Sequence, residues 1–215
     1  MTASFAAVIG LAGIADLFQS RNLVRPPGAI HGVEFTDSCI KCGACVKACP
    51  VRALETAHIT DGLQNVGTPA LVASDRYCMI FKNLEYPSVT LATAKQVAQI
   101  GATWKRTQST HLTDQELCSK CVDVCPTAAL RPTSLDQVHM GTAVVHRDHC
   151  LAWLYASCNF ACIDACVFDA ITIQQGPIVD ANLCVGCNQC SYVCIARLGT
   201  GETGIMVEAT QPKEQ

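Results

Sequence analysis

Apolar positions in this chain occur mostly in short runs separated by polar turns, rather than in long periodic stretches. Brief apolar runs at Ala53-Leu54, Ala129-Leu130 and residues 170–173 predict short strands. Residues 171–182 predict a strand, a Gly-Pro turn and a second strand, and residues 141–146 predict another short strand. Many short elements joined by loops indicate an α+β fold in which side-chain packing supplies only part of the core.

Two longer patterns stand apart from these strands. Residues 90–107 have the apolar spacing of an amphipathic helix, although Gly101 weakens that prediction. Residues 5–15 form an eleven-residue apolar run, too short for a bilayer span of about 20 residues. That run has the length of the apolar part of an export signal, and it also suits a helix packed on a membrane subunit or on its own domain.

Composition then narrows the class of protein. The chain has 215 residues, of which 50% are hydrophobic and 15% charged, so it is not a disordered chain. Its net charge of −3 provides no basic surface for nucleic acid, and we expect no nucleic-acid partner. It contains sixteen cysteines, a number that requires a chemical explanation.

The cysteines form four groups of four, and none is left over. The groups are Cys39, Cys42, Cys45 and Cys49; Cys78, Cys118, Cys121 and Cys125; Cys150, Cys158, Cys162 and Cys166; and Cys184, Cys187, Cys190 and Cys194. The first and fourth groups have the spacing C-x2-C-x2-C-x3-C of bacterial ferredoxins, which suits a [4Fe–4S] cluster. Three closely spaced thiolates can wrap three corners of one cube, and the fourth reaches a neighbouring cluster in two-cluster ferredoxins.

Other chemistries fit the spacing less well. Structural zinc prefers paired C-x2-4-C knuckles, and a disulfide framework predicts more scattered cysteines. The sequence therefore predicts four [4Fe–4S] clusters held by all sixteen cysteines. Cys78 lies 40 positions before Cys118 and is the least secure ligand, with His111 as an alternative.

The chain has no phosphate-binding loop, dinucleotide-binding glycine motif or nucleophile elbow. We therefore expect an electron-transfer subunit with no substrate chemistry of its own. Three alternatives stay open at this stage. They are the iron–sulfur subunit of a molybdopterin oxidoreductase, an electron donor for cofactor maturation, and a zinc-based interaction module.

Several strings around the cysteines resemble the NapG/MauM ferredoxin-type family. They are residues 25–30 ahead of the first group, residues 67–69 leading to Cys78, and residues 140–145 leading into residues 150–153. The resemblance covers about residues 23–208, apart from an insertion at 79–117.

The resemblance implies a duplicated bacterial-ferredoxin-like fold with four [4Fe–4S] clusters. It also implies electron transfer between a polytopic, quinol-linked membrane protein and a redox enzyme or cytochrome. Family members are exported, so a membrane-associated site on the periplasmic side is expected. Residues 1–18 and the insertion at 79–117 are the expected docking elements.

By the same resemblance, the first cysteine group pairs with the fourth and the second with the third. The implied ligand sets are Cys39, Cys42, Cys45 and Cys194; Cys184, Cys187, Cys190 and Cys49; Cys78, Cys118, Cys121 and Cys166; and Cys150, Cys158, Cys162 and Cys125. The domains that follow are residues 31–66 with 177–215 as one ferredoxin-like half and residues 67–176 as the other. Residues 1–30 form an apolar helix and a linker ahead of both halves.

The sequence also departs from the family. It has no twin-arginine pair, and its second group has the spacing C-x39-C-x2-C-x3-C instead of C-x2-C-x4-C-x3-C. The insertion indicates a different partner, so nitrate reduction is not carried over.

Overall fold

A computed structural model describes residues 21–72, 76–80, 117–196 and 202–209 of the 215-residue chain. The apolar run at 5–15, the helix expected at 90–107 and His111 lie outside these described residues. Within the described residues, no helix has the length and apolar character needed to cross a membrane.

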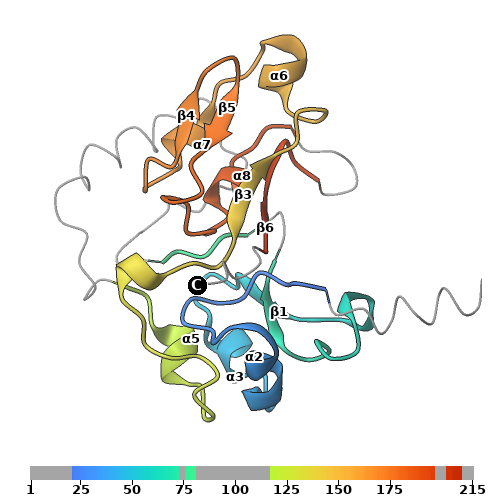
Figure 1. The fold of residues 1–215 in the computed structure, drawn as a ribbon, viewed down its shortest axis with the longest axis vertical. Helices are drawn as coiled ribbons and strands as arrows, with labels where there is room; N and C mark the ends of the chain where they lie inside the picture. Colours follow the sequence, from blue (N-terminus) through green and yellow to red (C-terminus); the bar gives the residue numbers. More distant parts are fainter. Residues whose placement is uncertain (1–20, 73–75, 81–116, 197–201, 210–215) are drawn as a thin grey trace, which may run out of the picture.

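The elements form two lobes, one below and one above in Figure 1. The first lobe contains α2 (Gly32–Ser38), α3 (Ala44–Ala48), β1 (Leu54–Thr56), η1 (Ile59–Asp61), β2 (Pro69–Leu71) and α5 (Lys120–Asp123). After η3 (Leu135–Gln137), the second lobe contains β3 (Thr142–Val145), α6 (Leu151–Tyr155), α7 (Ala161–Asp164), β4 (Ile171–Ile173), β5 (Pro177–Val179), α8 (Gln189–Tyr192) and β6 (Ile205–Glu208). Short helices and strands of this kind confirm a mixed helix and strand structure rich in loops.

Three antiparallel pairs of strands stabilise the lobes, and each pair lies within a single lobe. In the first lobe β1 pairs with β2, and Leu54 lies opposite Leu71. In the second lobe β4 pairs with β5 in the expected hairpin, and β3 pairs with β6. Leu130 forms only an isolated bridge with Ala29, so the strand expected near it is limited to one contact.

The lobes divide the chain differently from the halves implied by the family resemblance. A boundary between residues 66 and 67 would separate β1 from β2, and one between 176 and 177 would separate β4 from β5. In the structure the first lobe ends after the second cysteine group, and the second lobe contains the third and fourth groups. The strand pairing therefore agrees with lobes that each combine two successive cysteine groups.

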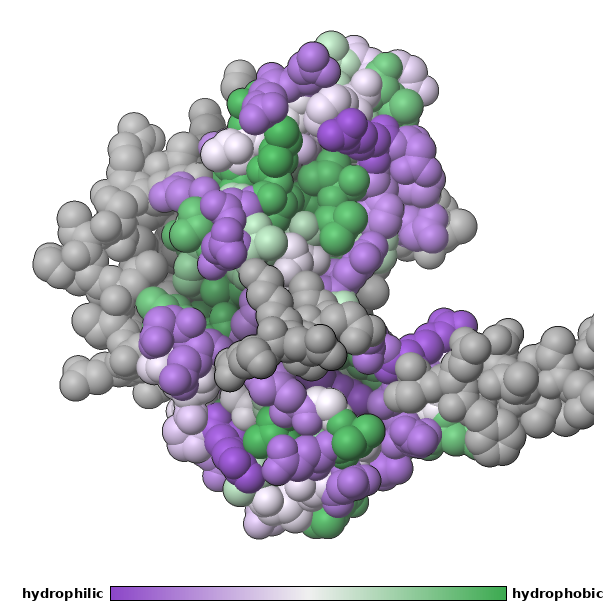
Figure 2. Space-filling view, in the orientation of Figure 1, coloured by the Kyte–Doolittle hydropathy of each residue, from purple (hydrophilic) through white to green (hydrophobic). Residues whose placement is uncertain are grey.

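Each lobe has its own apolar core, and a third core lies where they meet. Phe35, 1% exposed, centres the first, while Ile205, 2% exposed, lies in the second. Ile80, Val138 and Val185 belong to the core between the lobes. In Figure 2 the visible face of the upper lobe gathers hydrophobic residues around β3 and β5, bordered by hydrophilic ones.

Candidate metal centre

The first cysteine run is shaped by the helices on either side of it. Cys39 follows α2, and its N–H donates to the Phe35 carbonyl at 2.9 Å, which ends the helix. Gly43 has a φ of 69° and begins α3, which places Cys45 within that helix. Left-handed backbone suits glycine because it has no Cβ. The run therefore folds as a loop between the end of α2 and the start of α3, and its first three cysteines line one cavity.

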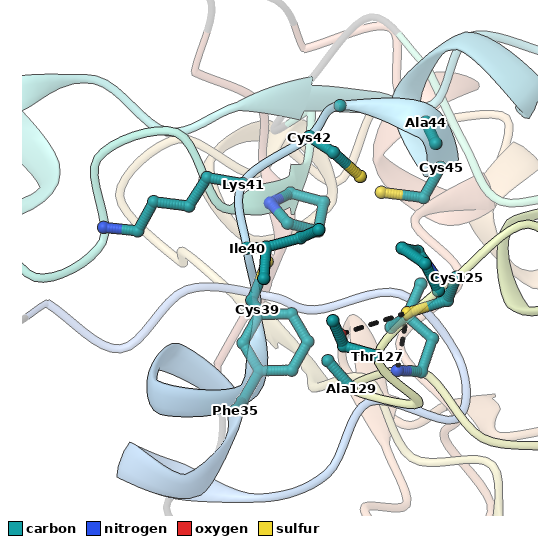
Figure 3. A pocket seen from close by; sticks show the side chains of 14 residues that line it. Phe35, Cys39, Ile40, Lys41, Cys42, Ala44, Cys45, Cys125, Thr127 and Ala129 are labelled. Atoms are coloured by element: carbon teal, nitrogen blue, oxygen red, sulfur yellow. Dashed lines mark hydrogen bonds between the residues drawn. The ribbon is translucent and has the colours of Figure 1, made fainter.

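That cavity receives its fourth thiol from the second cysteine group. Cys39, Cys42, Cys45 and Cys125 line it, with the Phe35 ring alongside (Figure 3). The thiols of Cys42 and Cys45 point into the cavity, and Cys125 faces them from another segment (Figure 3). Helix α3 packs against α5, and this contact carries Cys125 to the first group.

A second set draws its thiols from the same pair of helices and from the segment around Cys78. Burial, followed by the neighbouring Cys118 and Cys49 thiols, raises the pKa of the Cys121 thiol to about 12. Burial also holds the Cys78 pKa well above its usual range, with Cys121 and Cys118 among the neighbouring thiols that contribute. Cys78, Cys118, Cys121 and Cys49 thus form the second set.

Cys78 reaches this set although 39 residues separate it from Cys118. The Cys118 N–H donates to the Ile80 carbonyl at 2.5 Å, so the two ends of the insertion meet. Because Ile80 and Cys118 are hydrogen-bonded, Cys78 lies close to Cys118 in space although the two are far apart in the sequence. The structure therefore places Cys78 with the other thiols of its group.

The second lobe repeats the exchange with its own two groups. Burial, followed by the neighbouring Cys194, Cys158 and Cys150 thiols, raises the pKa of the Cys162 thiol to about 12. Burial of Cys190 raises its pKa well above the usual range, and Cys187, Cys184, Cys162 and Cys166 thiols add to the shift. Helix α7 packs on α8, which brings these groups together. The sets are Cys150, Cys158, Cys162 and Cys194, and Cys184, Cys187, Cys190 and Cys166.

This pairing differs from the one implied by the family resemblance. There, Cys194 completed the first set, Cys49 the fourth, Cys166 the second and Cys125 the third. In the structure the fourth cysteine of each group crosses to its neighbour in the same lobe, because α3 packs on α5 and α7 on α8. The sixteen cysteines stay in four sets of four, while the partners change.

A repeated hydrogen bond marks the fourth cysteine of three groups. The Cys49 sulfur accepts the Ala53 N–H at 3.3 Å, and Cys166 accepts the Ala170 N–H at 3.3 Å. Burial tends to raise the Cys125 pKa, but hydrogen bonds, including that from the Leu130 N–H at 3.5 Å, lower it overall. Bonds from N–H to sulfur stabilise the thiolate form, which is the form that binds iron.

The donor sets fit [4Fe–4S] clusters chemically. All sixteen cysteines are free of disulfide bonds, and each set offers four sulfurs. In the described ranges, no three His, Cys, Asp or Glu side chains are close enough to hold a single metal ion. A cluster occupies the space between its thiolates, whereas one ion requires the ligands to converge.

A half-buried cation, Arg25, packs against Phe35, one of the residues that line the first site. The Arg25 guanidinium stacks on the Phe35 ring at 4.8 Å and donates to Thr68 Oγ1 and Asn65 Oδ1, both at 2.7 Å. Desolvation by burial lowers the Arg25 pKa to about 10. Sequence reasoning missed this role, although Arg25 opens one of the strings shared with ferredoxin-type proteins.

Comparison with known proteins agrees with this donor chemistry. The family description "4Fe-4S binding domain" matches residues 33–55. The chain is 29% identical to the ferredoxin-type protein NapG of Escherichia coli over 189 residues, which is 80% of this chain and 66% of that protein. It is also 29% identical to the methylamine utilization ferredoxin-type protein MauM of Methylophilus methylotrophus, over 90% of this chain and 77% of that protein. These findings confirm the resemblance expected from the cysteine strings.

Proposed function

Because this chain is a homologue of the NapG and MauM ferredoxin-type proteins, we propose that it relays single electrons through four [4Fe–4S] clusters. The observation that carries the proposal is the gathering of sixteen free thiols into four sets of four. When bound, [4Fe–4S] clusters supply one-electron oxidation and reduction. The protein's own residues would hold, shield and tune them.

Three features of the chain serve this role. Thiolates exchanged between neighbouring groups hold two sites in each lobe. Buried apolar residues such as Phe35 and Ile205 exclude water around the sulfurs. Backbone N–H groups that donate to sulfur, as at Cys49 and Cys166, raise the reduction potential because they stabilise added negative charge.

The partners belong to the same proposal. Electrons would pass between a polytopic, quinol-linked membrane protein and a redox enzyme or cytochrome. The chain would work as a subunit without substrate chemistry of its own, at the membrane on the periplasmic side. Residues 1–18 and 79–117 would dock these partners. Support for this comes from the ferredoxin-type relatives, of which the chain spans about two thirds of NapG.

The test is metal analysis of the protein purified without oxygen. Iron, zinc and acid-labile sulfide are measured per chain on the sample used for an EPR redox titration. Four clusters require about 16 iron and 16 sulfide per chain. About 12 of each would remove one cluster from the proposal, and about four zinc with little sulfide would refute electron transfer.

A further inference from the structure

The segment of residues 76–80 lies between the lobes and touches both. It carries Cys78, a thiol of the first lobe, and the Cys78 N–H donates to the Cys187 carbonyl of the second lobe at 2.9 Å. The Tyr77 and Tyr192 rings, each from a different lobe, contact each other in a tilted arrangement with centroids 4.9 Å apart. Two candidate cluster ligands from different lobes are therefore joined by one backbone hydrogen bond.

Asn188 secures this junction from the second lobe. The residue is 1% exposed, and its Nδ2 donates to the carbonyls of Val72 at 3.1 Å and Arg76 at 2.7 Å. The Val72 N–H in turn donates to the Ala53 carbonyl at 2.9 Å, within the first lobe. Asn188 thus links the fourth cysteine run to the backbone that delivers Cys78.

The position of Asn188 in the fourth cysteine run separates the role of its backbone from the role of its side chain. Asn188 directly precedes α8 with a φ of 70°, as Gly43 directly precedes α3 with a φ of 69°. Each residue directly follows the second cysteine of a C-x2-C-x2-C run. Glycine satisfies the backbone at the first site, so the amide of Asn188 is not needed for the loop itself. Its hydrogen bonds serve the contact between lobes.

We propose that Asn188 is a positioning residue that sets electron passage between the lobes by holding Cys78 against Cys187. This inference rests on the proposed function. The thiol sets would then be arranged along one route for electrons. In order, they are Cys39, Cys42, Cys45 and Cys125; Cys78, Cys118, Cys121 and Cys49; Cys184, Cys187, Cys190 and Cys166; and Cys150, Cys158, Cys162 and Cys194.

The ends of this order face solvent, while its middle is enclosed. Cys42 is exposed at one end, and at the other Cys158 lies in a loop whose neighbour Ser157 is exposed. The middle is covered by the core that contains Ile80 and Val185. In each passage one electron leaves a reduced site in one lobe and reduces the oxidised site in the other. No covalent bond forms or breaks, and no proton moves.

The test compares Asn188→Gly with the matched control Asn182→Gly. Asn182 is exposed, and its backbone N–H donates to Asp180 Oδ1, a bond that the substitution leaves in place. Both variants are purified without oxygen and loaded with iron. Glycine at 188 keeps the left-handed backbone and removes the two hydrogen bonds to Val72 and Arg76.

Two measurements report directly on the contact between Cys78 and Cys187. Hydrogen exchange of the Cys78 amide, which donates to Cys187, should accelerate about thirty-fold in Asn188→Gly, because two hydrogen bonds contribute about 2 kcal/mol. The magnetic interaction between reduced clusters of the two lobes, measured by EPR, should weaken at the same time. Asn182→Gly should match the wild type in both.

The outcomes separate this inference from the proposed function. Wild-type metal content tests the function first, independently of any variant. Full iron in Asn188→Gly with faster exchange and weaker interaction between lobes supports the positioning role. An unchanged interaction despite faster exchange would overturn it. So would a loss of iron specific to Asn188→Gly, because Asn188 would then support one site instead of the passage.

Discussion

Replacing Arg25 with methionine tests how much the first site depends on this half-buried cation. The guanidinium donates to Thr68 Oγ1, the Pro69 carbonyl and Asn65 Oδ1 at 2.7–2.8 Å, and it stacks on Phe35. Methionine keeps much of the apolar stem and removes all three hydrogen bonds. Asn65 is 2% exposed and Thr68 is fully buried, so water does not readily replace the lost donor.

The expected magnitude follows from these contacts. A hydrogen bond from a charged donor contributes about 1.5–3 kcal/mol, and release of the buried charge offsets part of the loss. We expect Arg25→Met to lower the free energy of unfolding by about 3–5 kcal/mol. For a chain of this size, that corresponds to a fall in melting temperature of about 10 °C.

The assay heats the iron-loaded protein without oxygen and follows helix content and iron release together. Arg131→Met is the matched control, because Arg131 is exposed and its Nε donates to the Ala128 carbonyl within the same turn. This control should change stability by no more than about 0.5 kcal/mol. Equal melting temperatures for Arg25→Met and the wild type would refute the supporting role of the cation.

Three further predictions concern the ligand sets and the local fold. Cys125→Ser should alter the EPR signal that Cys39→Ser also alters, while Cys194→Ser should leave it unchanged; the reverse result would restore the family pairing. Gly28→Ala should destabilise the protein by at least about 2 kcal/mol in chemical denaturation, because φ is +77° and the new Cβ would lie 2.0 Å from the Arg131 carbonyl oxygen. Because the Cys121 pKa is about 12, iron loading should release protons and strengthen as pH rises, measured by pH-stat titration; loading independent of pH would contradict this.

The identity of the cysteine ligands was easier to predict from the sequence than the way they combine into sets of four. Cysteine spacing grouped the cysteines, and the apolar and turn pattern of residues 171–182 predicted a hairpin, which the structure confirms as β4 paired with β5. Both patterns are local. Pairing depends on which helices pack together, and the C-x2-C-x2-C spacing is the same whichever group supplies the fourth thiol. That choice is made by the contacts of α3 with α5 and of α7 with α8, which are contacts between separate segments.

Asn188 shows a second limit of the same kind. In the sequence it occupies one of the two positions between Cys187 and Cys190, and the cysteine spacing alone does not specify the residue there. Its hydrogen bonds reach Val72 and Arg76, more than a hundred positions earlier. Only the folded chain brings these residues together, so no local pattern indicates the link.

The exchange of thiols within each lobe has a consequence for the order in which the protein is made. All eight thiols of the first lobe occur between Cys39 and Cys125, before any thiol of the second lobe begins at Cys150. Domains fold from the N-terminus as a chain is synthesised. A nascent chain that has passed residue 125 already contains every ligand for two clusters. If the proposed function holds, we expect the first lobe to be able to acquire its iron and sulfide while the second is still being translated.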